Sequence, residues 1–321
     1  MRASRLTLPV VAVALVAATA PASGGAVGAA VSWQEVFAPD GTITRVAVPV
    51  AAEPRALASE VVADVVPVQQ TGPADRRFDL VFVGDGYTAS ELGSYHAHVV
   101  DKWAELSAVE PFKSYKQYFN VWRVDVVSAE SGVDNDPTLG VARDTALDMG
   151  FWCQGRDVNT ERLLCVNQAK AGQFGALAPE ADQVIALGNT AKYGGAGGGV
   201  ATAAGANAQA GQIAVHELGH SIGGLADEYD YPYDRYAGGE PTEPNTTADP
   251  GGAKWSRHLG QVSPDGGTVG AYEGSRYYRY GLYRPTENSI MRTLGREFNL
   301  VGREAMVNAF KAKVPELRRA P

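Results

Sequence analysis

The stretch Gly211–Asp230 reads GQIAVHELGHSIGGLADEYD and encloses a glutamate between two histidines that are four residues apart. Apolar residues across 208–225 have helical spacing, so His216 and His220 should lie one above the other on a single helix face. Both imidazoles can then bind one Zn²⁺ at about 2.0–2.1 Å, with Glu217 beside a fourth, water-occupied position. A metal that acidifies water, next to a carboxylate that takes the proton, is the chemistry of hydrolysis.

A catalytic zinc site needs a third protein ligand, and two glycines decide where it can come from. In a continuous helix Asp227 would lie roughly 10 Å along the axis from His220. Gly223 and Gly224 instead favour a helix end, because glycine readily takes the left-handed conformation that turns the chain back. Asp227 or Glu228 can then reach the metal. We favour Asp227 for its shorter return path, and expect Glu228 to hold a histidine in one tautomer.

Three quoted segments together resemble the M64 family of secreted bacterial metallopeptidases, whose first described member cleaves immunoglobulin A. They are HELGHSIGGLADEY (216–229), YAGGEPTEPNTTADPGGAKW (236–255) and LVFVGDGYT (80–88), and the resemblance covers residues 79–303. It implies a metzincin-like zinc peptidase with His216, His220 and an acid of the ADEY segment as ligands and Glu217 as base. The common metzincin pattern HExxHxxGxxH/D would put its third ligand at Ala226, and here Asp227 follows one residue later.

Metzincins place a methionine turn beneath the metal. In this chain ENSIMRT (287–293) puts Met291 in a polar, turn-like setting, so the resemblance implies that Met291 forms the floor of the site; the alternative is a methionine that fills a core gap. The tyrosines of RYYRYGLYR (276–284) could stabilise an oxyanion or line subsites. In GVDNDPT, Asp134 and Asp136 lack the remaining ligands of a calcium loop and indicate a solvated turn.

The pattern along the chain predicts an α/β (α+β) fold. A β-hairpin is expected over 31–50, a linker over 51–74, and a buried strand at 76–88 that leads into a helix opened by the capping pair Thr88 and Glu91. Further expected elements are a short helix at 111–119, strands at 119–128 and 181–189, an edge strand within 193–202, an irregular segment from 227 to 283 and a helix at 301–314.

We therefore predict a metzincin-like zinc peptidase domain (76–321) with a mixed twisted sheet, an active-site helix and a Met-turn. A hairpin extension and linker (23–75) would precede it, and whether this extension is a removable prosegment stays open. Arg2 and Arg5 before the apolar run 6–18, with Ala20-Pro21-Ala22 after it, predict a signal peptide over 1–22. The mature protein is then secreted.

Composition and cysteine usage narrow the function. The net charge of −8 gives no attraction to nucleic acid or acidic membranes, and we expect a monomer that takes a protein or peptide substrate. In a secreted chain Cys153 and Cys165 should form a disulfide. The sequence favours an endopeptidase with one catalytic Zn²⁺. The alternatives are a zinc amidase acting on cell-wall peptides and a catalytically idle binding protein of the same fold.

Overall fold

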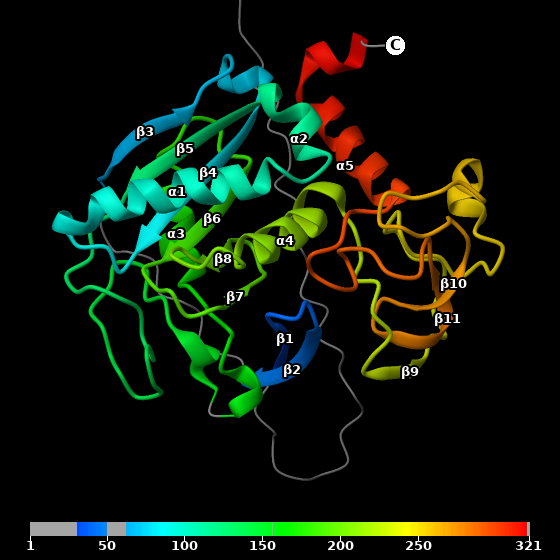
Figure 1. Cartoon of the computed structure of the whole chain (residues 1–321), viewed down its shortest axis with the longest axis horizontal. Coiled ribbons are helices and arrows are strands. Elements are labelled where there is room, and N and C mark those ends of the chain that lie inside the picture. The colour runs from blue at the N-terminus through cyan, green and yellow to red at the C-terminus, as the bar shows by residue number, and fades with distance from the viewer. Residues whose placement is uncertain (1–30, 50–61, 156, 320–321) are drawn as a thin grey trace, which may run out of the picture.

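A mixed six-stranded sheet forms the centre of the computed structural model, which describes residues 31–49, 62–155 and 157–319 (Figure 1). In spatial order its strands are β3 (Asp64–Gln69), β5 (Phe119–Asp125), β4 (Phe78–Asp85), β6 (Gln183–Gly188), β8 (Ala201–Ala204) and β7 (Gly195–Ala196). The four inner strands are parallel, and each edge strand is antiparallel to its neighbour. The predicted α+β class with a mixed sheet is confirmed.

Helices cover both faces of this sheet. The helices α1 (Leu92–Leu106) and α4 (Gly211–Gly223) contact each other on one face, and α3 (Gln168–Gly175) packs on the other (Figure 1). All eight residues of β4 are buried, as expected for a parallel strand covered on both sides, whose sequence reads as a nearly continuous apolar run. The two remaining helices are α2 (Phe112–Tyr115) and α5 (Leu300–Lys313).

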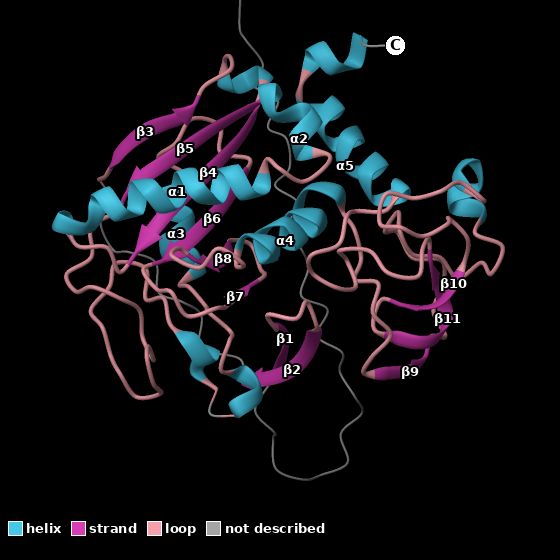
Figure 2. Ribbon diagram, in the orientation of Figure 1, coloured by secondary structure: helices cyan, strands magenta, loops and turns pink. Residues whose placement is uncertain are grey.

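The N-terminal strands β1 (Val31–Phe37) and β2 (Ile43–Pro49) pair antiparallel and confirm the predicted hairpin, apart from Val50, which lies outside the described residues. The hairpin lies next to α4, between the main sheet and the region of β9 to β11 (Figure 2). Phe37 and Ile43, which flank its turn, are fully buried. The hairpin is thus docked into the molecule and does not stand free of it.

Two expectations about irregular segments are wrong. Residues 64–69, expected within a linker, form β3, whose backbone pairs antiparallel with the outer side of β5. The segment 227–283, expected to be irregular, contains a second sheet in the order β10 (Tyr272–Ser275), β11 (Tyr278–Arg284) and β9 (Tyr233–Arg235). Its tyrosines pack in pairs across the strands, such as Tyr233 with Tyr278. The division into domains at residue 76 stays a prediction.

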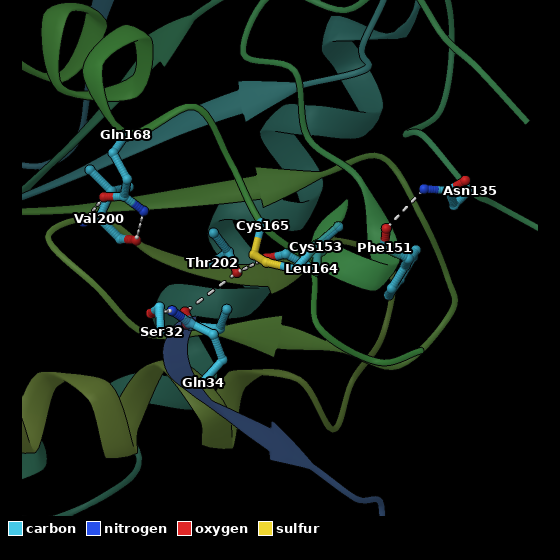
Figure 3. The surroundings of a disulfide bond; sticks show 11 residues. Ser32, Gln34, Asn135, Phe151, Cys153, Leu164, Cys165, Gln168, Val200 and Thr202 are labelled. Atoms are coloured by element: carbon cyan, nitrogen blue, oxygen red, sulfur yellow. Dashed lines mark hydrogen bonds between the residues drawn. A yellow bond between two sulfur atoms is a disulfide. The ribbon is translucent and has the colours of Figure 1, made fainter. Parts of the chain in front are cut away.

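Cys153 and Cys165 form the predicted disulfide (Figure 3). Next to it the Thr202 hydroxyl of β8 donates to the carbonyl of Leu164, which ties the disulfide loop to the main sheet. β1 passes close by in the same view. The predicted signal peptide, residues 1–22, lies outside the described residues. Among those that are described, no helix has the length and apolar character needed to cross a bilayer.

Candidate metal centre

The helix α4 carries both histidines and ends where the glycines predict. Gly224 has φ +61°, and its N–H donates to the carbonyl of His220 at 3.0 Å, while the N–H of Leu225 donates to Gly219 at 3.2 Å. Such paired bonds around a left-handed glycine close a helix and satisfy its last carbonyl groups. The chain therefore reverses, and the residues after Leu225 run back beside the histidines.

Three side chains converge at this point. The Nε2 atoms of His216 and His220 are 3.1 Å apart, and Oδ1 of Asp227 lies 3.3 Å from each of them. Ligands placed about 2.0–2.1 Å from a tetrahedral zinc ion would be roughly 3.3 Å from one another. The spacing of the three atoms is therefore the spacing that a single tetrahedral metal ion requires.

Hydrogen bonds at the far side of each imidazole fix its tautomer. Nδ1 of His216 lies 3.0 Å from the carbonyl oxygen of Ile290, and Nδ1 of His220 lies 2.7 Å from that of Leu225. Since a carbonyl oxygen only accepts, each Nδ1 carries the proton, and in the neutral ring Nε2 turns a lone pair inward. Oδ1 of Asp227 is buried and has no hydrogen-bond partner in the described part of the chain. Three electron pairs that face one point suit a divalent cation.

The pKa values of the site also favour a bound cation. Burial opposes the charge on both rings, yet the Asp227 carboxylate raises the pKa of His220 to about 9 and, together with Glu35, raises that of His216 well above its usual value. Burial opposes ionisation of Asp227 as well, but the two histidines hold its pKa well below the usual range. The site therefore favours positive charge strongly, and a bound cation would supply that charge without protonating the rings.

Glu217 lies on α4 between the histidines and is buried. Its Oε1 has no hydrogen-bond partner within residues 31–49, 62–155 and 157–319. The side chain extends toward the loop after the edge strand β7, where a Cβ at Gly197 would come within 2.3 Å of Oε2, so only glycine leaves room for the carboxylate. Burial, with the nearby charge of Glu35, raises the pKa of Glu217 to about 7. A carboxyl group tuned to this range can both take and release a proton near neutral pH.

The two adjacent acids after the helix point in different directions. Asp227 faces the histidines, whereas the carboxylate of Glu228 accepts hydrogen bonds from Ser289, Asn245 and Asn299 at 2.7, 2.9 and 2.8 Å. The expectation that Glu228 holds a histidine tautomer is wrong, since backbone carbonyl groups do so. Successive residues in an extended segment project to opposite sides, and this alternation separates the two acids.

Met291 lies beneath α4 in a turn and is buried. A Cβ built at Gly219 would be 2.7 Å from its Sδ, so the missing side chain of Gly219 lets the sulfur pack directly under the histidine-bearing helix. The carbonyl of Met291 accepts from the N–H of Glu228 at 2.7 Å, which connects this turn to the chain beside Asp227. The role of Met291 as the floor of the site, which the resemblance implied, stays a prediction.

Three further side chains at the site are not predicted by the sequence reasoning. Glu35 from β1 joins His216, His220 and Asp227 as a fourth possible ligand, and its Oε2 is 3.5 Å from Nε2 of His216. The Tyr229 hydroxyl donates to Glu35 Oε1.

The third unpredicted contribution comes from the tyrosine-rich segment 276–284. The hydroxyl of Tyr277 donates to Oδ2 of Asp227 at 2.6 Å, which leaves Oδ1 facing the histidines. Tyr277 thus orients a candidate ligand, a role different from the expected contact with an oxyanion. No pattern marks these contacts in the sequence, since each joins elements far apart in the chain.

The other expected side chains lie away from this cluster. Asp136 accepts from the hydroxyl of Thr190, and Asp134 accepts from the backbone N–H of Arg143, as turn residues do.

A mixed sheet with a histidine-bearing helix and a group of side chains that could hold a metal ion fits an α+β metallopeptidase domain. The family model described as IgA Peptidase M64 matches residues 66–265 and 261–310, and the chain belongs to this family of metallopeptidases. It is therefore a peptidase, and a hydrolase, that acts on proteins or peptides. A search of the curated proteins found no match to this chain.

Proposed function

We propose that this chain is a secreted zinc-dependent endopeptidase in which His216, His220 and Asp227 bind the metal and Glu217 is the general base. The observation that carries the proposal is the convergence of two Nε2 atoms and one carboxylate oxygen at 3.1 to 3.3 Å, with a buried carboxyl group on the intervening turn of the same helix. Nitrogen ligands with one carboxylate suit zinc among the common divalent ions.

The chain's own groups then have separate tasks. When bound, zinc would lower the pKa of a water molecule and polarise the peptide carbonyl. Glu217 would accept the proton of the attacking water and return it to the leaving amine nitrogen, because its pKa of about 7 permits both steps. Tyr277 keeps Oδ1 of Asp227 turned to the metal. The carbonyl groups of Ile290 and Leu225 hold both histidines in the ligating tautomer.

Secretion and the substrate path are also part of the proposal. The N-terminal segment 1–22 has the layout of a signal peptide, and the disulfide fits an oxidising compartment. The loop after the edge strand β7, at Gly197, lies beside the Glu217 carboxylate, and we propose that an extended substrate binds along this loop. We further propose that the secreted protein is a monomer.

The first test is zinc content by elemental analysis in wild type, Asp227→Ala and Glu228→Ala. We expect one zinc per wild-type chain, loss of zinc in Asp227→Ala, and zinc still present in folded Glu228→Ala. Hydrolysis of casein and of purified peptidoglycan, measured alongside, separates an endopeptidase from a cell-wall amidase. A wild-type chain without zinc that cleaves neither substrate would contradict the proposal and favour a binding protein.

A further inference from the structure

Glu35 lies close to the three side chains that are proposed to bind the metal. Its Oε2 lies 3.5 Å from Nε2 of His216, close to the tetrahedral spacing of the other three ligand atoms, and all four atoms lie within 4.8 Å of one another. The Tyr229 hydroxyl donates to Oε1, so Oε2 is the oxygen left for the cluster. Four protein ligands are typical of a closed zinc site, whereas catalytic sites keep one position for water or substrate.

A bound cation would balance the charge of the carboxyl groups near Glu35. Three carboxyl groups, those of Glu35, Glu217 and Asp227, are gathered around two imidazoles in a buried region. Carboxylates in such a place are costly unless they are paired or coordinate a metal. Glu35 is therefore better explained as a ligand than as a hairpin side chain that happens to lie nearby.

The hairpin that carries Glu35 is held from several sides. Phe37 is fully buried, with its ring 5.5 Å from that of His216, and the guanidinium of Arg45 lies 3.7 Å from the ring centre of Tyr277. The hairpin turn is anchored next to the Met-turn, since the carbonyl of Gly41 accepts from the N–H of Leu294 at 2.9 Å. These contacts fix the hairpin directly over the groups proposed for catalysis.

The hairpin also packs beside the edge strand β7, next to the loop along which a substrate would lie. Val36 and Val48 pack against Leu163 and against Ala196 of the edge strand β7, with the disulfide beside them. In Figure 3 β1 runs next to the disulfide loop. The match to the peptidase family covers residues 66–265 and 261–310, and the hairpin at 31–49 precedes it in the chain.

We propose that Glu35 is a fourth metal ligand, that the hairpin β1–β2 occupies the substrate position, and that the chain carrying it is consequently a latent peptidase. The inference rests on the proposed zinc function. Removal or displacement of the hairpin would return the fourth metal position to water and uncover Tyr229, Tyr277 and Ala196 of β7. Latency would come from occupation of the site and not from a distorted site, because the remaining ligands already have tetrahedral spacing.

The test compares residues 23–321 as wild type, Glu35→Ala and Glu35→Gln, each loaded with Co²⁺ in place of zinc. Asp40→Asn is the matched control, because Asp40 lies in the same hairpin, is exposed and points to its own turn. Acetohydroxamate, a small metal ligand, is titrated while the visible Co²⁺ spectrum is recorded. We expect the spectra of wild type and Asp40→Asn to stay unchanged, and those of both Glu35 variants to shift as the ligand enters the open position.

The zinc-loaded forms are assayed in parallel on casein. We expect Glu35→Ala to exceed wild type by about tenfold or more, because loss of the contact between Glu35 and the metal lets the hairpin leave the substrate position more often, and activity rises with that open fraction. If wild type binds the metal but its spectrum already responds like that of Glu35→Ala, the inference is overturned and the zinc function stands. If wild type binds no metal, both are overturned. Zinc-loaded Glu35→Ala that cleaves nothing, with an open spectrum, would contradict only the peptidase function.

Discussion

The two walls of the metal centre are built in different ways. On one wall, α4 positions His216, Glu217 and His220 by the repeat of the helix alone. On the other wall, Asp227 and Met291 lie on irregular segments and are positioned by buried hydrogen bonds around Glu228. The helical wall needs the correct spacing in sequence and one backbone carbonyl group beside each imidazole. The loop wall needs partners from three distant parts of the chain, so its geometry depends on polar groups that must all be satisfied.

The two walls should respond differently to substitution. Glu228 is fully buried, and burial raises the pKa of its carboxyl group even though three side chains donate to it. Asn245 adds a second connection, because it exchanges hydrogen bonds with both the N–H and the carbonyl of Ala226. A buried network of this kind stabilises when complete and becomes costly when one member is lost. We expect substitutions on the helical wall to reduce the rate of hydrolysis most. Substitutions on the loop wall should reduce the free energy of unfolding most.

The largest expected effect is on chemistry, in Glu217→Gln. The amide keeps the shape of the side chain but cannot accept the proton, so hydrolysis should fall by about 10²–10⁴-fold. Zinc content should stay at the wild-type level, because Glu217 is not a proposed ligand. The assay uses casein and the Glu35→Ala background, so that latency does not mask the change. If the variant loses zinc as well as activity, Glu217 helps to bind the metal. The proposed roles, Glu217 as base and the two histidines as ligands, would then be wrong.

The next effect is on stability, in Asn245→Ala. This change leaves Glu228 with one donor fewer and the backbone groups of Ala226 without partners, so the free energy of unfolding should fall by about 1–3 kcal/mol. Urea denaturation measures it. Asn159→Ala is the control, because Asn159 is exposed and far from this network, and it should change stability by less than about 0.5 kcal/mol. Equal losses in both variants would argue against a polar network as the support of the loop wall.

The smallest effect concerns pH and the sheet side of the molecule, in His98→Gln. Burial and the nearby charge of Lys102 lower the pKa of His98, which contacts the Tyr87 hydroxyl at 2.9 Å. A histidine with a lowered folded-state pKa contributes stability above its unfolded pKa of about 6.5, and loses it as the pH falls through the folded value. His98→Gln should therefore reduce the loss of unfolding free energy on acidification. If the free energy of unfolding depends on pH in the same way in wild type and variant, the loss of stability in acid comes from groups other than His98, such as those of the candidate metal centre.

Much of the fold could be predicted because it depends on local periodicity. The hairpin from 31, the strands at β4, β5 and β6, and the helices α1 and α5 each follow a pattern of two or 3.6 residues that the chain shows by itself. β3 could not be recognised, because a short edge strand with Pro67 in it resembles a linker until the neighbouring strand is known. The sheet of β9 to β11 could not be recognised either, because β9 has 3 residues and pairs with β11, which comes much later in the chain.

The sequence by itself determined the histidine spacing, the position of Glu217 between the histidines and the glycine turn that returns Asp227 to them. All of these follow from the geometry of one helix and its end. Only the tertiary structure decided that Glu228 accepts from Ser289 in the turn before Met291, that Tyr277 orients Asp227 and that Glu35 lies among the side chains that could bind a metal. These contacts connect residues far apart in the chain, and no local repeat encodes which distant side chains meet once the core is packed.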